Sequence, residues 1–360
     1  MKRKHFIALD VHCQFVEAVG MTESGRITRR ERCPTEVPAL RSLVQSVCGC
    51  REVVMEEGPL ADWLLRSLAG CADAVVACDP RRNHLIGRDS DKDDPIDAEK
   101  LGHLYRGGYV KLVHHPESLD RQVFKRLVAL YHDGVRERVR RANRVMGELR
   151  QYGVFVTQRA FKDAARREER ATLLSRLPDH PLVRACVESL LRSYDAVVRQ
   201  TARQRKLLIR EAAKEPQIVR FTALPGVKWI RAATFFAYVD TPWRFHSVSA
   251  LYKYMGIGLE RRHSGAGPEQ LKVAQRVNRP LKNMILGAAK SAIRSGTNPF
   301  AERNVRWLDA GLTPRVARRS TARSLAAVMW GMFKNGSVYR PELVGAADKV
   351  SALMSTSKAR

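Results

Sequence analysis

The order of strand-like and helix-like segments in the first 118 residues restricts the fold more than any other feature of this chain. An apolar run at residues 5–10 predicts a first strand, and residues 14–20 and 26–33 predict two more around the turn Thr22-Glu23-Ser24-Gly25. Helical and strand patterns then alternate, at residues 38–47, 52–58, 60–68 and 74–80. Consecutive strands followed by such alternation predict a mixed α/β sheet domain with helices packed on its faces.

Acidic residues stand where two of these strands end. Asp10 closes the first strand, and Glu56 closes the strand at residues 52–58. Glu57 follows directly, and the local pattern only weakly separates it from Glu56. A single acid at such a position is usually a solvated surface group, so neither strand end is informative by itself.

A further acidic pair begins the helix that is predicted around Pro95. Asp94 and Asp97 are three residues apart, so they share one helix face, where two like charges are costly unless a cation lies between them. With Asp10 and Glu56 they make a set of four carboxylates from separated elements. Mg²⁺, or Mn²⁺ as an alternative, prefers such oxygen ligands and can promote phosphodiester chemistry. The sequence therefore predicts a metal site for phosphoryl transfer.

The charge of the chain is large and unevenly distributed. Lys and Arg number 64 against 37 Asp and Glu, a formal net charge of +27. Residues 1–118 are nearly neutral, whereas residues 119–219 and 220–340 hold almost all of the excess. This favours nucleic acid as a partner over an anionic membrane, since neither an amphipathic anchor nor a membrane-length apolar run is evident. Seven cysteines without zinc-type spacing indicate a reducing cytoplasm.

Residues 119–219 have the periodicity of two long helices. Apolar positions recur at helical spacing from Val123 to Leu149 and again from Leu182 to Leu208, with many arginines between them. A loop or short helix at residues 159–170 separates them. An antiparallel helical arm or coiled-coil hairpin is expected. It is either a spacer with a solvated basic face or a dimerisation element whose arginines contact nucleic-acid phosphates.

Residues 220–340 predict a mainly helical domain. Leu224-Pro225-Gly226-Val227 and a helix at 229–239 resemble a helix-hairpin-helix element, which contacts DNA phosphates without reading sequence, although Pro-Gly is more often an ordinary turn. Basic helices are expected at 271–294 and 314–332, followed by a frayed tail.

Ser264 lies in the glycine-rich segment at residues 256–268, beside Arg261, Arg262 and His263. A serine hydroxyl among cationic groups can act as a nucleophile toward a phosphate. Serine before glycine in a loop is more often a simple turn residue, so local chemistry leaves both interpretations open.

Taken together, these pieces resemble the DEDD-type insertion-sequence transposases, a group related to the Piv invertase and guided by a bridge RNA. The resemblance covers residues 5–340. In the first domain it rests on Ile7-Ala8-Leu9-Asp10-Val11, Met55-Glu56-Glu57-Gly58, Cys78-Asp79-Pro80-Arg81-Arg82-Asn83 and Lys92-Asp93-Asp94-Pro95-Ile96-Asp97-Ala98. In the last domain it rests on Leu224-Pro225-Gly226-Val227, Arg244-Phe245, Leu251-x-x-Tyr254-x-Gly256-Ile257 and His263-Ser264-Gly265.

The resemblance implies four consecutive parts. These are a RuvC-like (RNase H-type) catalytic domain, a helical coiled-coil arm, a C-terminal transposase domain and a tail, at residues 1–118, 119–219, 220–340 and 341–360. It implies that Asp10, Glu56, Asp94 and Asp97 bind Mg²⁺ and that Ser264 forms a transient phosphoserine link to DNA.

The same resemblance implies the partners of the protein. They are donor DNA, target DNA and a guide (bridge) RNA that selects both by base pairing. The catalytic site would combine domains from different subunits of a homo-oligomer, a dimer or a tetramer on DNA. The protein would be prokaryotic, cytoplasmic and associated with the nucleoid.

Two other function classes remain as alternatives. A RuvC-like junction resolvase would use the same carboxylates with metal-activated water and would need no serine. A nucleic-acid-binding protein without activity would carry the acids only as charge balance. Strand exchange conserves phosphodiester bond energy, and the chain has no G-x-x-x-x-G-K-[ST] motif for ATP.

Overall fold

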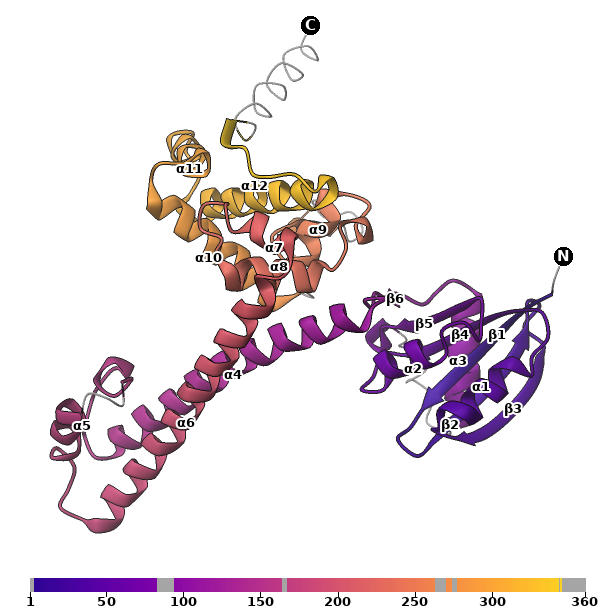
Figure 1. Ribbon diagram of the computed structural model, residues 1–360, viewed down its shortest axis with the longest axis horizontal. Coiled ribbons are helices and arrows are strands. Elements are labelled where there is room, and N and C mark those ends of the chain that lie inside the picture. Colours follow the sequence, from indigo (N-terminus) through magenta and orange to yellow (C-terminus); the bar gives the residue numbers. More distant parts are fainter. Residues whose placement is uncertain are drawn as a thin grey trace, which may run out of the picture. The chain divides into compact units, whose positions relative to one another are not determined.

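The computed structural model describes residues 3–82, 94–163, 167–262, 270–273, 277–342 and 344. The chain forms two compact units, Met1–Glu117 and Ser118–Arg360 (Figure 1). Each unit has its own hydrophobic core. The further division of the second unit at residue 219 stays a prediction.

The first unit is built on a six-stranded sheet with the order β3-β2-β1-β4-β5-β6. Its strands are β1 (Lys4–Val11), β2 (Phe15–Thr22), β3 (Ile27–Pro34), β4 (Cys50–Glu56), β5 (Ala74–Cys78) and β6 (Leu112–Val113). β4 runs parallel to β1 and β5, while β2, β3 and β6 pair antiparallel with their neighbours. The predicted mixed sheet is therefore confirmed, except that two-residue β6 is too short to produce a sequence pattern.

Helices cover both faces of this sheet. α1 (Val37–Gln45) and α2 (Ala61–Ser67) share a core with Ile7, Leu9 and Met55. α3 (Asp94–Arg106) covers the other face, where its Ala98 packs with Phe6 and its Leu101 with Ala8 and Val54. Successive strand residues point to opposite faces, which is why odd-numbered β1 residues face α1 and even-numbered ones face α3.

The second unit begins with two long helices that run side by side in opposite directions (Figure 1). They are α4 (Leu119–Gln151) and α6 (Pro181–Ala212), close to the predicted spans. The segment between them holds η2 (Gln158–Ala160) and α5 (Arg167–Leu174). At this end Tyr194 packs edge-on against Phe161, and Arg170 forms a two-pronged ion pair with Asp195. Coiled-coil packing stays a prediction.

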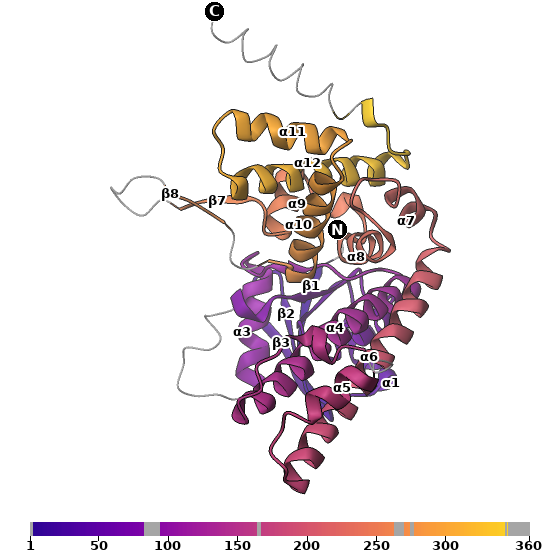
Figure 2. The same ribbon diagram turned by 90° about the vertical axis from the view of Figure 1, so that its left-hand side faces the viewer.

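The remaining helices form a bundle around one core (Figure 2). They are α7 (Pro216–Phe221), α8 (Trp229–Val239), η3 (Pro242–Arg244), α9 (Val248–Tyr254), α10 (Arg279–Ser295), α11 (Pro299–Asp309) and α12 (Pro314–Asn335). β7 (Leu259–Arg262) and β8 (Gln270–Val273) form a separate antiparallel pair. No helix in the described part of the chain is both long and apolar enough to cross a bilayer.

The helix predicted at residues 271–294 is wrong at its start. Residues 270–273 form strand β8 opposite β7, and α10 begins only at Arg279. Asn278 caps this helix by accepting a hydrogen bond from the backbone N–H of Leu281 at 3.0 Å, and Pro280 occupies the first turn. Cross-strand pairing therefore overrides the helical periodicity of residues 271–273.

Candidate functional site

Asp10 and Glu56 occupy equivalent positions on adjoining parallel strands. Leu9 of β1 is paired with Met55 of β4, so the next residue on each strand is the predicted acid. Glu56 is in turn paired with Cys78 of β5. Both acids are partly exposed, and the side chain of Asp10 is 28% accessible. The register therefore makes the two carboxylates neighbours at the carboxyl ends of β1 and β4.

Strand alternation places both acids on the face that α3 covers. Asp10 has the parity of Ala8, and Glu56 has the parity of Val54, and both apolar residues pack against α3. On that helix Asp97 precedes buried Ala98 and is itself partly exposed.

The side chain of Asp94, in the first turn of α3, lies outside the described residues. Among the side chains that are described, no three His, Cys, Asp or Glu groups are arranged to hold a metal ion.

Glu57 belongs to a different cluster, on the α2 side of the sheet. One of its carboxylate oxygens lies 2.7 Å from Nε2 of His115, and Nδ1 of this ring lies 2.6 Å from Asp62. His115 is only 11% exposed. Burial lowers the pKa of His115, but hydrogen bonds and charges of the two carboxylates outweigh it and raise the pKa above its ordinary value. Glu57 is thus a structural partner of His115.

A row of three further side chains begins beside Asp10, and the sequence patterns did not identify their role. Nε2 of His12 lies 3.0 Å from Oδ2 of Asp10, and its ring stacks on Phe15 with 4.7 Å between centroids. Phe15 also carries the guanidinium of Arg32 at 4.3 Å from its ring centre. The i, i+2 spacing of Asp10, near the end of β1, and His12, directly after that strand, was the available signal.

Glu17 lies directly opposite Asp10 in the β1–β2 register. It is a buried acid, 6% exposed, and its carboxylate accepts a hydrogen bond from Nε of Arg32. This ion pair offsets a second negative charge beside Asp10, which would otherwise make burial of Glu17 costly. The environment of Asp10 is therefore strongly organised by residues of β2 and β3.

Ser264 and His263 lie in the segment 263–269, outside the described residues. The strands on either side of that segment are described, and Arg262 of β7 is paired with Gln270 of β8. Helix α12 contacts the chain just before β7, where Nε of Arg323 donates a hydrogen bond to the carbonyl oxygen of Ile257 at 2.8 Å.

Arg315, Arg318, Arg319 and Arg323 form a cationic surface on α12, called here the α12 arginine face. Their spacing brings them to adjacent positions on the helix. Burial first, and then the charges of the other three, lower the pKa of Arg319. Arg315, Arg318 and Arg319 have no carboxylate partner among the described residues. Such a surface is typical of a nucleic-acid interface.

The Pro225-Gly226 turn packs closely against α10. Gly226 has φ +75°, and a Cβ there would lie 2.3 Å from the carbonyl oxygen of Ala288. Arg231 donates hydrogen bonds to the carbonyl oxygen of Gly226 and, at 2.9 Å, to Oγ of Ser291. Close packing therefore explains this glycine, and the helix-hairpin-helix interpretation stays a prediction.

Two known relatives are similar to this chain over most of its length. The "Transposase for insertion sequence element IS1111A" of Coxiella burnetii is 23% identical over 351 residues, covering 94% of this chain and 92% of the relative. The "Putative transposase y4pF/y4sB" of Sinorhizobium fredii is 25% identical over 257 residues, covering 69% of this chain and 64% of the relative.

Two transposase family models also match, in chain order. The DEDD transposase model of the IS110 group matches residues 7–154, which include Asp10, Glu56, Asp94 and Asp97. The model described as "Transposase IS116/IS110/IS902 family" matches residues 219–304, which include Ser264. On these two matches, the chain belongs to the IS110 family of insertion-sequence transposases.

Proposed function

We propose that this transposase exchanges DNA strands by metal-dependent phosphoryl transfer, with Ser264 as the nucleophile. Asp10, Glu56, Asp94 and Asp97 are the proposed metal ligands. The observation that carries the proposal is the β1–β4 register, which makes Asp10 and Glu56 neighbours on the face covered by α3. The helix on that face begins at Asp94 and carries Asp97 one turn later.

The donor set fits a hard divalent cation. Four carboxylates provide only oxygen ligands, which suit Mg²⁺ and also Mn²⁺. When bound, such an ion stabilises the negative charge on the oxygens of the scissile phosphate. The 3.0 Å hydrogen bond from His12 holds the carboxylate of Asp10 in one orientation, as outer partners of metal ligands commonly do.

Ser264 supplies the covalent step of this proposal. Its Oγ bonds to phosphorus while a phosphorus–oxygen bond to one deoxyribose breaks, and the serine proton passes to the departing oxygen. A hydroxyl of the new partner strand then attacks the phosphoserine and restores the serine. Bond energy is conserved, in agreement with the lack of a Walker motif. Support for Ser264 comes from the motif resemblance and from its location in the second matched region.

Nucleic-acid contacts are assigned to the basic second unit. The α12 arginine face supports binding of the DNA backbone near the β7–β8 strands. A guide RNA that selects donor and target DNA, and a homo-oligomer that completes the site, follow from the sequence resemblance. The excess of Lys and Arg over residues 119–340 is in agreement with two polyanionic partners.

Covalent trapping tests this proposal. Wild type, Ser264→Ala and the control Ser337→Ala would be incubated with cognate DNA, Mg²⁺ and guide RNA, then denatured and separated by electrophoresis. Ser337 is exposed and follows α12, so its hydroxyl is a matched control. A protein–DNA adduct is expected in wild type and Ser337→Ala and not in Ser264→Ala.

Other outcomes point to the alternative functions. Mg²⁺-dependent cleavage that proceeds equally in wild type and Ser264→Ala, without an adduct, would favour a water-using junction resolvase. DNA binding without any cleavage in wild type would favour a protein that only binds nucleic acid. Either result would overturn the serine mechanism.

A further inference from the structure

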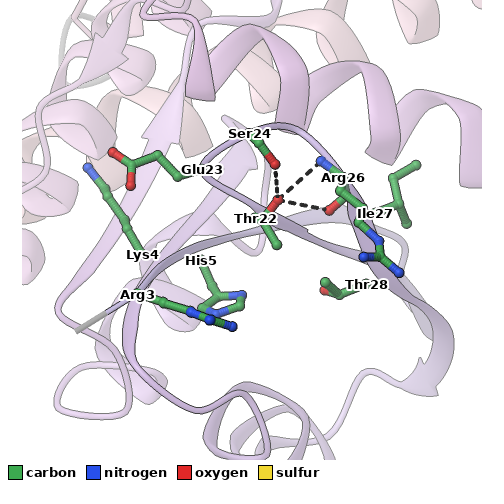
Figure 3. A pocket seen from close by; sticks show the side chains of 9 residues that line it. All are labelled: Arg3, Lys4, His5, Thr22, Glu23, Ser24, Arg26, Ile27 and Thr28. Carbon is green, nitrogen blue, oxygen red and sulfur yellow. Dashed lines mark hydrogen bonds between the residues drawn. The ribbon is translucent and has the colours of Figure 1, made fainter. Parts of the chain in front are cut away.

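A recess of about 620 Å³ lies in the first unit where β1 begins and β2 turns into β3. Its wall comes from the start of β1 and from the β2–β3 turn, and it consists of Arg3, Lys4, His5, Thr22, Glu23, Ser24, Arg26, Ile27 and Thr28. Figure 3 shows Arg3 and His5 on one side of this recess and Arg26 and Thr28 on another. Neither the family matches nor the carboxylate site accounts for it.

Two arginines give the recess its positive charge. Lys4 is neutralised by a 2.7 Å ion pair with Glu52, and the nearby charge of Glu23 acts on it as well. Arg3 and Arg26, by contrast, have no carboxylate partner within the described residues. The recess, whose wall also includes Glu23, therefore presents two guanidinium groups outside any ion pair of the described residues, and such groups bind phosphate.

Hydroxyl groups on a tight turn accompany these cations. Oγ1 of Thr22 accepts a hydrogen bond from the backbone N–H of Arg26 at 3.2 Å and lies 2.8 Å from Oγ of Ser24. Gly25, with φ +88°, closes the turn against Arg106, which also donates a hydrogen bond to the carbonyl oxygen of Glu23 at 3.2 Å. Arginines with neighbouring hydroxyls are the usual contacts to a nucleic-acid backbone.

The recess is remote from the proposed metal site. His5 and Asp10 are five residues apart on β1, which corresponds to about 17 Å of extended strand. His5 also has the parity of Ile7 and Leu9, so it points to the face opposite that of Asp10. A ligand in the recess is therefore not the phosphate that reacts.

We infer that this recess binds the phosphodiester backbone of a nucleic-acid segment separate from the reacting strand, with Arg3 and Arg26 as its main contacts. The inference rests on the proposed function only in taking nucleic acid as the partner. DNA outside the exchange site and guide RNA share the backbone chemistry that the recess recognises. The experiment below distinguishes them.

Equilibrium binding at several KCl concentrations tests the inference. The probes are a single-stranded RNA oligonucleotide and a mixed-sequence DNA duplex, each titrated with wild type and with an Arg3→Ala, Arg26→Ala double variant. Loss of two phosphate contacts should lessen the slope of log K against log salt by about 1.4 for single strands and about 1.8 for duplex. A change with RNA alone identifies guide RNA, and a change with DNA alone identifies flanking DNA.

Two control variants make the result specific. Arg41→Ala, Arg66→Ala removes the same charge from α1 and α2, and should leave the slope nearer to that of wild type. Arg3→Lys, Arg26→Lys keeps the charge and should restore most of the slope. Equal slopes for the recess variant and the Arg41, Arg66 control with both probes would overturn the inference, and so would a wild-type slope in the recess variant.

This outcome is independent of the covalent trapping experiment. Binding requires no strand exchange, so failure of the Ser264 assignment leaves the salt slopes unchanged. Where wild type is active, the recess variant should retain its turnover number at saturating nucleic acid and show only a raised KM. A reduced turnover number with unchanged binding would contradict a role in holding a remote segment.

Discussion

Glu57 lies 2.7 Å from Nε2 of His115, on the side of the sheet opposite to that expected for its neighbour Glu56. This relationship assigns different roles to two adjacent acids that sequence alone barely separates. Glu56 continues the α3-facing row of β4, whereas Glu57 joins Asp62 around a buried imidazole. The difference follows from strand alternation, which turns successive residues to opposite faces.

The first prediction concerns these two acids. Glu56→Gln should abolish strand exchange and leave the melting temperature close to that of wild type. Glu57→Gln should keep substantial activity but lower the free energy of unfolding by about 1 kcal/mol at pH 6, since Glu57 is 40% exposed and its ion pair is partly screened. Activity assays and urea denaturation of both variants measure the two effects.

The pH dependence of this stabilisation has a defined sign. The pKa of His115 is raised in the folded protein, so the pairing contributes fully below about pH 6.5, the ordinary value. The contribution is lost as the pH rises through the raised pKa. The stability gap between wild type and Glu57→Gln should therefore be wider at pH 6 than at pH 9, and a gap that widens toward pH 9 would contradict it.

Much of the first unit could be predicted because its signals are local. Apolar runs that end in Asp10 and Glu56 indicated the strands, and Pro95 indicated the start of α3. The faces of the sheet were not predictable in this way, because they depend on pairing between β1 and β4 across some 45 residues of sequence. Consequently the sequence placed Glu56 and Glu57 together at one strand end and only weakly indicated which of them is the metal ligand.

Residues brought together from distant segments had no local signal at all. His115 meets Glu57 and Asp62 across more than 50 positions, and it follows a strand of only two residues. The β7–β8 pair was likewise missed, because four-residue strands in a basic segment resemble the start of an amphipathic helix. Tertiary pairing decides such short elements.

A second prediction addresses the hydrogen bond between His12 and Asp10. His12→Ala removes a donor that orients the proposed ligand, so the Mg²⁺ concentration for half-maximal activity should rise by about 10-fold or more. Direct Mn²⁺ binding, followed by electron paramagnetic resonance, should weaken in parallel. His12→Gln retains a donor and should be less affected. An unchanged Mg²⁺ dependence in His12→Ala would show that Asp10 is oriented without it.

The α12 arginine face gives a third prediction. When Ala replaces Arg315, Arg318 and Arg319, the slope of log K for DNA binding against log salt concentration should become shallower by about 2 to 3. The melting temperature should stay constant or rise, because burial and then the charges of the neighbouring arginines lower the pKa of Arg319, so that removing these charges relieves the folded state. The corresponding Lys variant should bind nearly as wild type does. A wild-type slope in the Ala variant would exclude this face as a DNA interface.

The Pro225-Gly226 turn gives the last prediction, for which the chain offers a matched control. Gly226 and Gly296 have nearly the same positive φ, +75° and +78°, so Ala is strained at either position. A Cβ at Gly296 meets open space, whereas one at Gly226 would lie 2.3 Å from the carbonyl oxygen of Ala288 and 2.9 Å from the nitrogen of Ala292.

Gly226→Ala should therefore cost at least about 2 kcal/mol more than Gly296→Ala in urea denaturation, because the turn and α10 must separate. The two contacted atoms belong to the helix backbone and cannot move aside as a flexible side chain would. Equal losses in the two variants would mean that the turn can move away from α10 at no cost. DNA affinity, measured at a temperature where both variants are folded, then reports whether the turn contacts phosphate in addition to packing on α10.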